Sequence, residues 1–147
     1  MKITLLYKTI DGTIESSIID SSKKLSEHFY AYEFLINQDN NIDLACASEY
    51  DIDTLEYIRT LYGIGINITS AGRTPKYNGS IGGATESNHQ NLFDCLDFVI
   101  KDATTLQINN IFSYLKLRGY TGIGRYKDNR FHIDRGYRDK LTLWDER

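Results

Sequence analysis

Alternating apolar residues mark several short strands along the chain. The segment KITLLYKTIDGTIESSIID holds two such stretches around Asp11-Gly12, a pair typical of a tight turn, so residues 1–22 are predicted to form a β-hairpin. Further strands are expected in IGINITS, YTGIGRY and NRFHID, and the last two are expected to pair with each other. The run FDCLDFVI is apolar at both odd and even positions, which is typical of a central strand.

Two longer segments carry apolar residues at helical spacing. Residues 50–63 and 104–119 repeat an apolar side chain every three or four positions, and each segment ends at a glycine. Thr74 and Pro75 suit a helix cap and a first helical position, so another helix start is expected there. This mixture predicts an α+β fold with a central, mainly antiparallel sheet and flanking helices. No repeat or linker divides the chain, so a single domain is expected over residues 1–147.

Composition and charge exclude several classes of function. The 147 residues are 41% apolar and 25% charged, with a net charge of −3 and no basic tract, so no nucleic-acid partner is expected. No apolar run approaches the roughly 18 residues of a membrane span, and the N-terminal run is too short for a signal peptide. Synthesis in a cytoplasm is therefore expected. The two cysteines, Cys46 and Cys95, lack the CxxC spacing of a zinc ribbon or redox pair.

Three places along the chain gather side chains that can do chemistry. His89 is followed by Asp97, the segment NRFHID carries His132 and Asp134, and TSAGRTPKYN carries Arg73. Residues two apart on a strand point to the same side, so His132 and Asp134 are expected to face one cleft. Two histidines and one carboxylate with an open fourth position make a hydrolytic zinc site, in which the metal activates a water and polarises a carbonyl. A nearby carboxylate can accept a proton, and an arginine can stabilise an oxyanion.

Asp97 is the unusual residue of the predicted central strand. It shares its strand face with Cys95 and Val99, so a buried carboxylate is expected, and such a group needs a cation or a donor beside it. The spacing leaves other interpretations open: Asp97 pairs with an arginine, Asp94 takes its place, or the histidines are ordinary core or surface residues. His28, in the segment LSEHF, is expected to be structural.

Cysteine chemistry and nucleotide binding are weaker alternatives. Cys95 with His132 and Asp134 has the residue types of a cysteine-peptidase triad, but a thiol in the middle of an apolar strand is usually inert packing. The glycines of GYTGIGRY precede a strand rather than a helix, so close backbone packing beside the site is expected instead of a phosphate loop. The stretch KDN is typical of a turn, and its Asp128 is a weaker candidate base.

The order of segments resembles a known family. The segments LSEHFYAYEFL, INITSAGRTPKYNGSIGGATESNH, CLDFV, GIGRY and FHIDRG follow one another as in the zinc D-alanyl-D-alanine peptidases, which share their fold with the hedgehog signalling domain. The resemblance covers about residues 25–136 and points to a branch of short phage and bacterial proteins. It implies a zinc-dependent peptidase that cuts peptidoglycan stem peptides or cross-links. The ligands of Zn²⁺ that it implies are His89, Asp97 and His132.

The same resemblance implies roles for four further residues. Arg73 matches an arginine near the substrate, which steadies the oxyanion or a substrate carboxylate, and Asp134 matches the acid two residues after the last ligand. Asp134 is taken as the catalytic base, and support of a metal ligand is the alternative. Ser87 and Tyr126 match positions expected to bind substrate. Because no signal peptide is visible, the resemblance favours a phage protein that reaches the wall through a holin or in a virion.

The chain departs from the family pattern at the metal site. Seven residues separate His89 from Asp97 where the family has six, and the glycine of that interval is replaced by Leu92 or Phe93. Some branches place a glutamate base where this chain has Asn129. The extra residue is expected to form a bulge that keeps Asp97 aimed at the metal. The alternative function is a wall-binding or virion structural domain that keeps the fold without the metal.

Overall fold

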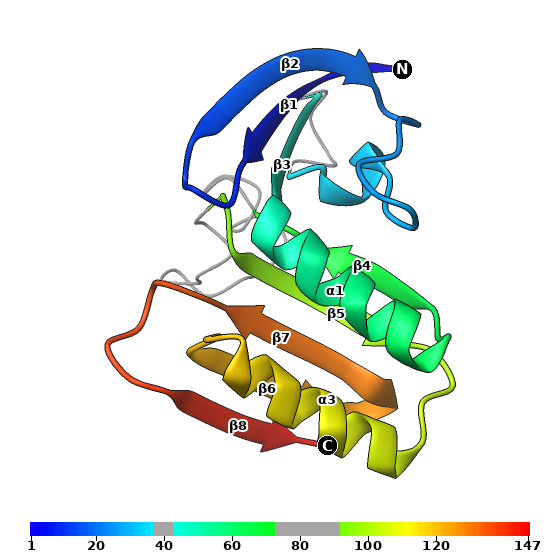
Figure 1. The fold of residues 1–147 in the computed structure, drawn as a ribbon, viewed down its shortest axis with the longest axis vertical. Coiled ribbons are helices and arrows are strands. Elements are labelled where there is room, and N and C mark those ends of the chain that lie inside the picture. Colours follow the sequence, from blue (N-terminus) through cyan, green and yellow to red (C-terminus); the bar gives the residue numbers. More distant parts are fainter. Residues whose placement is uncertain (37–42, 73–91) are drawn as a thin grey trace.

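The computed structural model describes residues 1–36, 43–72 and 92–147, and within them it contains two β-sheets and two α-helices (Figure 1). Strands and helices together give the predicted α+β fold. The helix start expected at Thr74 and Pro75 lies outside the described residues. None of the described helices is long and apolar enough to cross a membrane.

A three-stranded sheet is built from the N-terminal part of the chain. Its order is β2, β1, β3, with the bounds Ile14–Asp20, Lys2–Lys8 and Leu44–Ser48. β1 and β2 pair antiparallel, and Gly12 in their turn has a φ of 90°, which glycine adopts without strain, so the predicted hairpin is confirmed. β3 pairs with β1 in parallel. The sequence pattern did not predict β3, because its segment LACAS is short and does not alternate in polarity.

A five-stranded sheet carries the other predicted strands and is mainly antiparallel, as expected. Its order is β4, β5, β7, β6, β8, with the bounds Ile66–Ser70, Cys95–Ile100, Arg130–Asp134, Gly122–Tyr126 and Thr142–Glu146. Neighbours pair antiparallel except β6 and β8, which are parallel. β5 has a neighbour on each side, as predicted for a central strand. The sequence pattern did not predict β8, because its segment TLWDE is short and ends in two charged residues.

Both α-helices lie over one face of the five-stranded sheet (Figure 1). α1 spans Glu49–Tyr62 and ends at Gly63, whose φ of 62° is left-handed. α3 spans Thr105–Leu117, and the Thr104 hydroxyl before it accepts a hydrogen bond from the backbone N–H of Gln107. Both helices were predicted from their apolar spacing. Two short 3₁₀ helices, η1 and η3, span Ala31–Phe34 and Lys127–Asn129.

The apolar core lies between these helices and the sheet, and it determines which sheet face is left for chemistry. Its residues here are Ile52, Leu55, Ile58, Ile66, Leu96, Phe98, Ile100, Ile108, Ile111, Leu115, Ile123, Phe131 and Ile133. Successive strand residues point to opposite faces of a sheet. Because Leu96 and Phe98 of β5 pack into this core, Asp97 between them points away from the helices.

A buried polar network joins the two sheets at the start of β5. Asp94, directly before β5, is buried, and its carboxylate accepts hydrogen bonds from Nζ of Lys8 and from the hydroxyl of Ser48, each at 2.7 Å. Arg135, directly after β7, donates to the same carboxylate through Nη2 at 3.4 Å. Lys8 and Ser48 are the last residues of β1 and β3. The network therefore anchors the strand that carries Asp97 to the N-terminal sheet.

Candidate active site

Strand pairing brings the candidate residues into one row across the five-stranded sheet. Asp97 on β5 stands opposite His132 on β7, and His132 stands opposite Gly124 on β6. Gly124 in turn stands opposite Trp144 on β8. Residues directly opposite each other on neighbouring strands share a face of the sheet. The row therefore lies on the face turned away from the helices, and we call it the histidine row.

His132 lies between two carboxylates, each of which contacts a different ring nitrogen. Nδ1 is 2.9 Å from Oδ1 of Asp97, and Nε2 is 2.7 Å from Oδ2 of Asp134. The side chain of Asp97 is 31% exposed, whereas those of His132 and Asp134 are 10% and 0% exposed. The expectation that Asp97 is buried is wrong, since its side chain stays partly exposed at the edge of the pocket while Cys95 on the same face is buried.

The surroundings of His132 favour a positive charge at its ring. Burial by itself lowers the pKa of the imidazole. The hydrogen bonds to Asp134 and Asp97, together with the charges of both carboxylates, outweigh burial and raise the pKa above its ordinary value. The site therefore attracts a cation at this ring, whether a proton or a metal ion.

Asp134 is held behind His132 by an arginine that sequence reasoning missed. Nε of Arg138 donates to both carboxylate oxygens of Asp134 at 3.0 and 3.2 Å, and Nη2 donates to Oδ2 at 3.0 Å. Gly122, opposite Asp134 on β6, makes room for this pair, since a Cβ there would lie within 3.0 Å of both carboxylate oxygens. Both oxygens of Asp134 are thus occupied by protein donors.

Trp144 covers the other side of the histidine row. Its ring centroid is 5.3 Å from that of His132, and its Nε1 donates to the hydroxyl of Tyr126 at 2.6 Å. Gly124 lies beneath the indole, where a Cβ would come within 3.0 Å of ring atoms. The guanidinium of Arg138 stacks over the same indole at 5.1 Å. The close backbone packing expected of the GIGRY glycines is confirmed.

Two alternatives from the sequence lose their support in this geometry. Asp94 cannot take the place of Asp97, because its carboxylate is turned toward Lys8 and Ser48. Cys95 is a buried thiol, and both ring nitrogens of His132 face carboxylates, an arrangement that does not favour a cysteine–histidine pair.

A bulge does lie beside Asp97, but on the neighbouring strand. The β4–β5 register shifts between Ile68 and Ser70, with Ser70 opposite Asp97, while the β5–β7 pairing is unbroken. In the described part of the longer His89–Asp97 interval, Asp94 adopts a left-handed φ of 57° directly before β5. The other residues up to position 91 lie outside the described residues. That the extra residue itself forms a bulge stays a prediction.

A pocket of about 280 Å³ adjoins the histidine row on the same face of the sheet. Its lining among the described residues is Thr69, Asp97, Tyr126, Arg130 and Phe131. Asp97 thus contacts His132 and also borders the pocket. Tyr126, which the resemblance assigns to substrate binding, lies in the same lining.

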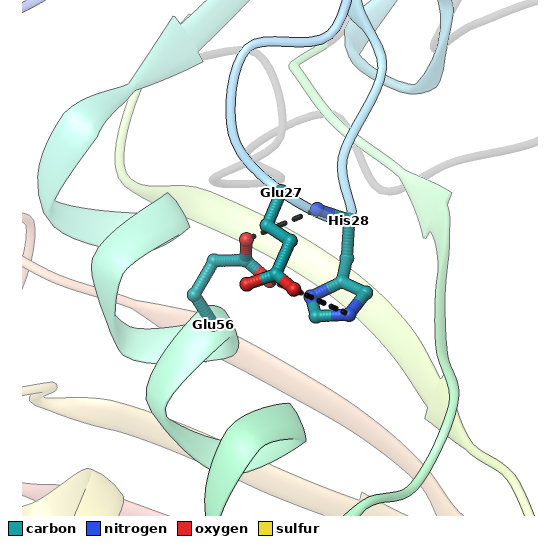
Figure 2. Close-up of side chains that lie close together, drawn as sticks. All are labelled: Glu27, His28 and Glu56. Carbon is teal, nitrogen blue, oxygen red and sulfur yellow. Dashed lines mark hydrogen bonds and ion pairs between the residues drawn. The ribbon is translucent and has the colours of Figure 1, made fainter.

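A second group of potential metal ligands lies where the loop before η1 meets α1. Among the described residues, Glu27, His28 and Glu56 place one ligand atom each within 4.8 Å of the others (Figure 2). The carboxylate of Glu56 accepts from the backbone N–H of His28 at 3.1 Å and contacts its Nδ1 at 2.8 Å. Glu27 instead faces Nε2, at 3.9 Å. The two carboxylates thus face different nitrogens of the His28 ring. The contacts with Glu56 attach the loop that carries His28 to α1, in keeping with the structural role expected of His28.

Three predicted site residues, Arg73, Ser87 and His89, lie outside the described residues. The structure brings the remaining ones together on one face of the five-stranded sheet. Sequence reasoning missed Arg138, which lies in the loop after β7, and Trp144, which approaches the site through the pairing of β8 with β6. The sequence held one signal for such neighbours: Gly122 and Gly124, at alternate positions of β6, leave space on one strand face that larger side chains must fill.

The comparison with protein families agrees with the predicted resemblance. A family model described as Peptidase M15 matches residues 27–134, within the region of about residues 25–136 that carries the resemblance. A search of curated proteins found no match to this sequence. The match covers most of the chain, which therefore belongs to the peptidase M15 family. This membership supports a metallopeptidase that acts on a peptide substrate.

Proposed function

We propose that this member of the peptidase M15 family is a zinc-dependent peptidase that hydrolyses peptide bonds of bacterial peptidoglycan, in a stem peptide or a cross-link. The observation that carries the proposal is the position of His132 between two carboxylates of different exposure. Nδ1 faces Asp97 at the pocket, whereas Nε2 faces the buried Asp134. A histidine that ligates a metal through one nitrogen commonly donates the other to a carboxylate in this way.

The donor set fits zinc. A ring nitrogen and a carboxylate oxygen are ligands that zinc takes, and Nδ1 of His132 lies 2.9 Å from Oδ1 of Asp97. Two ligands on one tetrahedral zinc are about 3.3 Å apart, so a small side-chain movement suffices. Asp97, His132 and His89 would hold the metal. When bound, zinc would lower the pKa of a water molecule and polarise the scissile carbonyl.

Asp134 supports the ligand in this proposal and is not the general base. Its carboxylate accepts from Nε2–H of His132, so a metal on this ring would be held at Nδ1, the nitrogen that faces Asp97. Arg138 occupies both oxygens of Asp134 and keeps it oriented. A base must reach the proton that it abstracts. Asp134, with 0% side-chain exposure, does not reach the pocket.

The remaining roles rest on the resemblance. Arg73 is proposed to steady the oxyanion or a substrate carboxylate, and Ser87 to bind substrate. Tyr126 has independent support, because it lines the pocket that Asp97 borders. We also propose a phage origin, on the likeness to the short phage and bacterial branch, with action on the cell wall after release or from a virion.

The metal content of protein purified without chelator tests the proposal. We expect about one zinc per chain by mass spectrometry, lost in His132→Ala and kept in a matched His28→Ala variant. Asp134→Asn is expected to weaken zinc binding about 10- to 100-fold, as measured by competition with a chelating dye. Wild-type protein should release peptides from purified peptidoglycan, and chelator should abolish the release.

A different outcome would favour a non-catalytic domain. Protein without zinc, even after zinc is added, would refute the peptidase mechanism. If such protein still sedimented with peptidoglycan but released no peptide, the wall-binding alternative would replace it. The longer interval between His89 and Asp97 is the observation that keeps this alternative in the test.

A further inference from the structure

A second row of side chains crosses the sheet one step from the histidine row. Arg130 on β7 stands opposite Val99 on β5 and Tyr126 on β6. Arg130 lies two positions before His132 on the same strand, so both side chains are on the face turned away from the helices. Two residues along a strand correspond to about 6.5 Å. We call Arg130 and Tyr126 the arginine subsite.

Arg130 is the cation of the pocket lining among the described residues. It is exposed, and its guanidinium makes no hydrogen bond or ion pair with another described residue, whereas Arg138 is committed to Asp134. Glu146 stands beyond Tyr126 in the same row, and among the described residues no ion pair joins it to Arg130. The charge of Arg130 is therefore available to a molecule in the pocket.

The chemistry of this subsite selects an anion of planar shape. A guanidinium binds a carboxylate through two parallel hydrogen bonds, and it keeps its charge at any physiological pH. The pocket volume of about 280 Å³ accommodates a small part of a peptide rather than an extended chain. The Tyr126 hydroxyl, which already accepts from Trp144, has its own proton left to donate.

We infer that the arginine subsite binds a carboxylate of the substrate beside the scissile bond, with Arg130 as the residue that determines this specificity. The inference rests on the proposed function, since Asp97 places the reacting bond at the edge of the same pocket. The step of about 6.5 Å between His132 and Arg130 equals about two residues of an extended peptide, so the subsite lies one or two residues from the reacting bond. The carboxylate is thus the chain terminus of the released residue or an acidic side chain next to the bond.

Two pairs of synthetic peptides distinguish these sources. The first pair ends in D-Ala-D-Ala with a free carboxylate or with a carboxamide. The second pair has a blocked terminus and carries D-glutamate or D-glutamine beside an internal bond. Steady-state kcat and KM are measured for zinc-loaded wild type, Arg130→Gln, Arg130→Lys and the control Lys127→Gln, which removes an exposed charge from the adjoining turn.

The expected result is a change in KM confined to one pair. For the carboxylate peptide of that pair, Arg130→Gln should raise KM about 10- to 100-fold with little change in kcat, because a charge-assisted contact made equally in ground and transition states is lost. Arg130→Lys should restore part of the loss, and Lys127→Gln should match wild type. The neutral peptide should bind wild type and Arg130→Gln equally weakly. Zinc content should be the same in all four proteins.

Two outcomes would overturn the inference and separate it from the proposed function. If wild type cuts the charged and neutral members of both pairs with equal KM, Arg130 does not recognise a carboxylate, although the peptidase function stands. If wild-type protein that holds zinc cuts none of the four peptides and releases nothing from peptidoglycan, the proposed function fails and the inference fails with it.

Discussion

The buried carboxyl of Asp51 should make the stability of this protein fall as the pH rises toward neutrality. Asp51, in the first turn of α1, is 1% exposed and accepts a hydrogen bond from the hydroxyl of Tyr120 at 2.6 Å. Burial and the nearby charge of Asp94 raise its pKa from an ordinary 3.8 to about 7. The Tyr120 hydrogen bond and the charges of Arg135 and Lys8 offset only part of that rise.

The sign follows from which state holds the proton. Between about pH 4 and pH 7 the folded protein keeps Asp51 protonated while the unfolded chain has lost the proton, so each rise in pH favours unfolding. The contribution to stability is complete below about pH 4 and is lost by about pH 7. A rise of about three in pKa corresponds to about 4 kcal/mol in full, of which about 2–3 kcal/mol falls between pH 5 and pH 8.

Asp51→Asn is the perturbation, because an amide keeps an acceptor for Tyr120 and does not titrate. Free energies of unfolding from urea titrations at pH 5 and pH 8 should show the wild type losing about 2–3 kcal/mol more than Asp51→Asn across this interval. Asp139→Asn, which removes an exposed carboxylate, should follow wild type. Equal pH dependence in wild type and Asp51→Asn would refute the reasoning.

Two further substitutions test the packing around the site and the second ligand group. Gly122→Ala should lower the free energy of unfolding by about 1–3 kcal/mol and weaken zinc binding, because a Cβ there displaces Asp134. The matched control is Gly65→Ala, whose Cβ meets only the Lys101 side chain at 3.6 Å. Equal zinc affinity in both variants would contradict the packing argument. Glu56→Gln should leave zinc at about one per chain by mass spectrometry, since Glu56 holds a loop rather than a metal; loss of zinc would show that the metal binds there.

Local pattern was enough to predict most elements and several site residues. Alternation with a period of two located the hairpin, β4, β6 and β7. A continuous apolar run located β5, and spacing of three to four located α1 and α3. The same rule placed His132 and Asp134 on one face, where their side chains do meet. These properties depend on residues close in sequence, because the pleat of a strand and the turn of a helix set side-chain direction locally.

The exposure of Asp97 and the choice between two acids required the tertiary structure. Alternation placed Asp97 with Cys95 and Val99, but only the tertiary structure decided that Asp97 stays partly exposed while Cys95 on the same face is buried. Asp94 and Asp97 are equivalent as residue types. Pairing of β5 with β7 sets Asp97 opposite His132, and the network with Lys8 turns Asp94 away.

Arg138 and Trp144 mark the limit of what the sequence determined by itself. Nothing in RGYRDKLTLWDER indicates that Arg138 grips Asp134 or that Trp144 covers His132. The Trp144 contact depends on the parallel pairing of β8 with β6, which joins segments some twenty residues apart. The Arg138 contact depends on the path of the loop between β7 and β8, which brings Arg138 back to Asp134. Side-chain direction along one strand is a local property of the backbone, whereas which residues stand opposite depends on how distant strands pair, and that is decided only when the sheet forms.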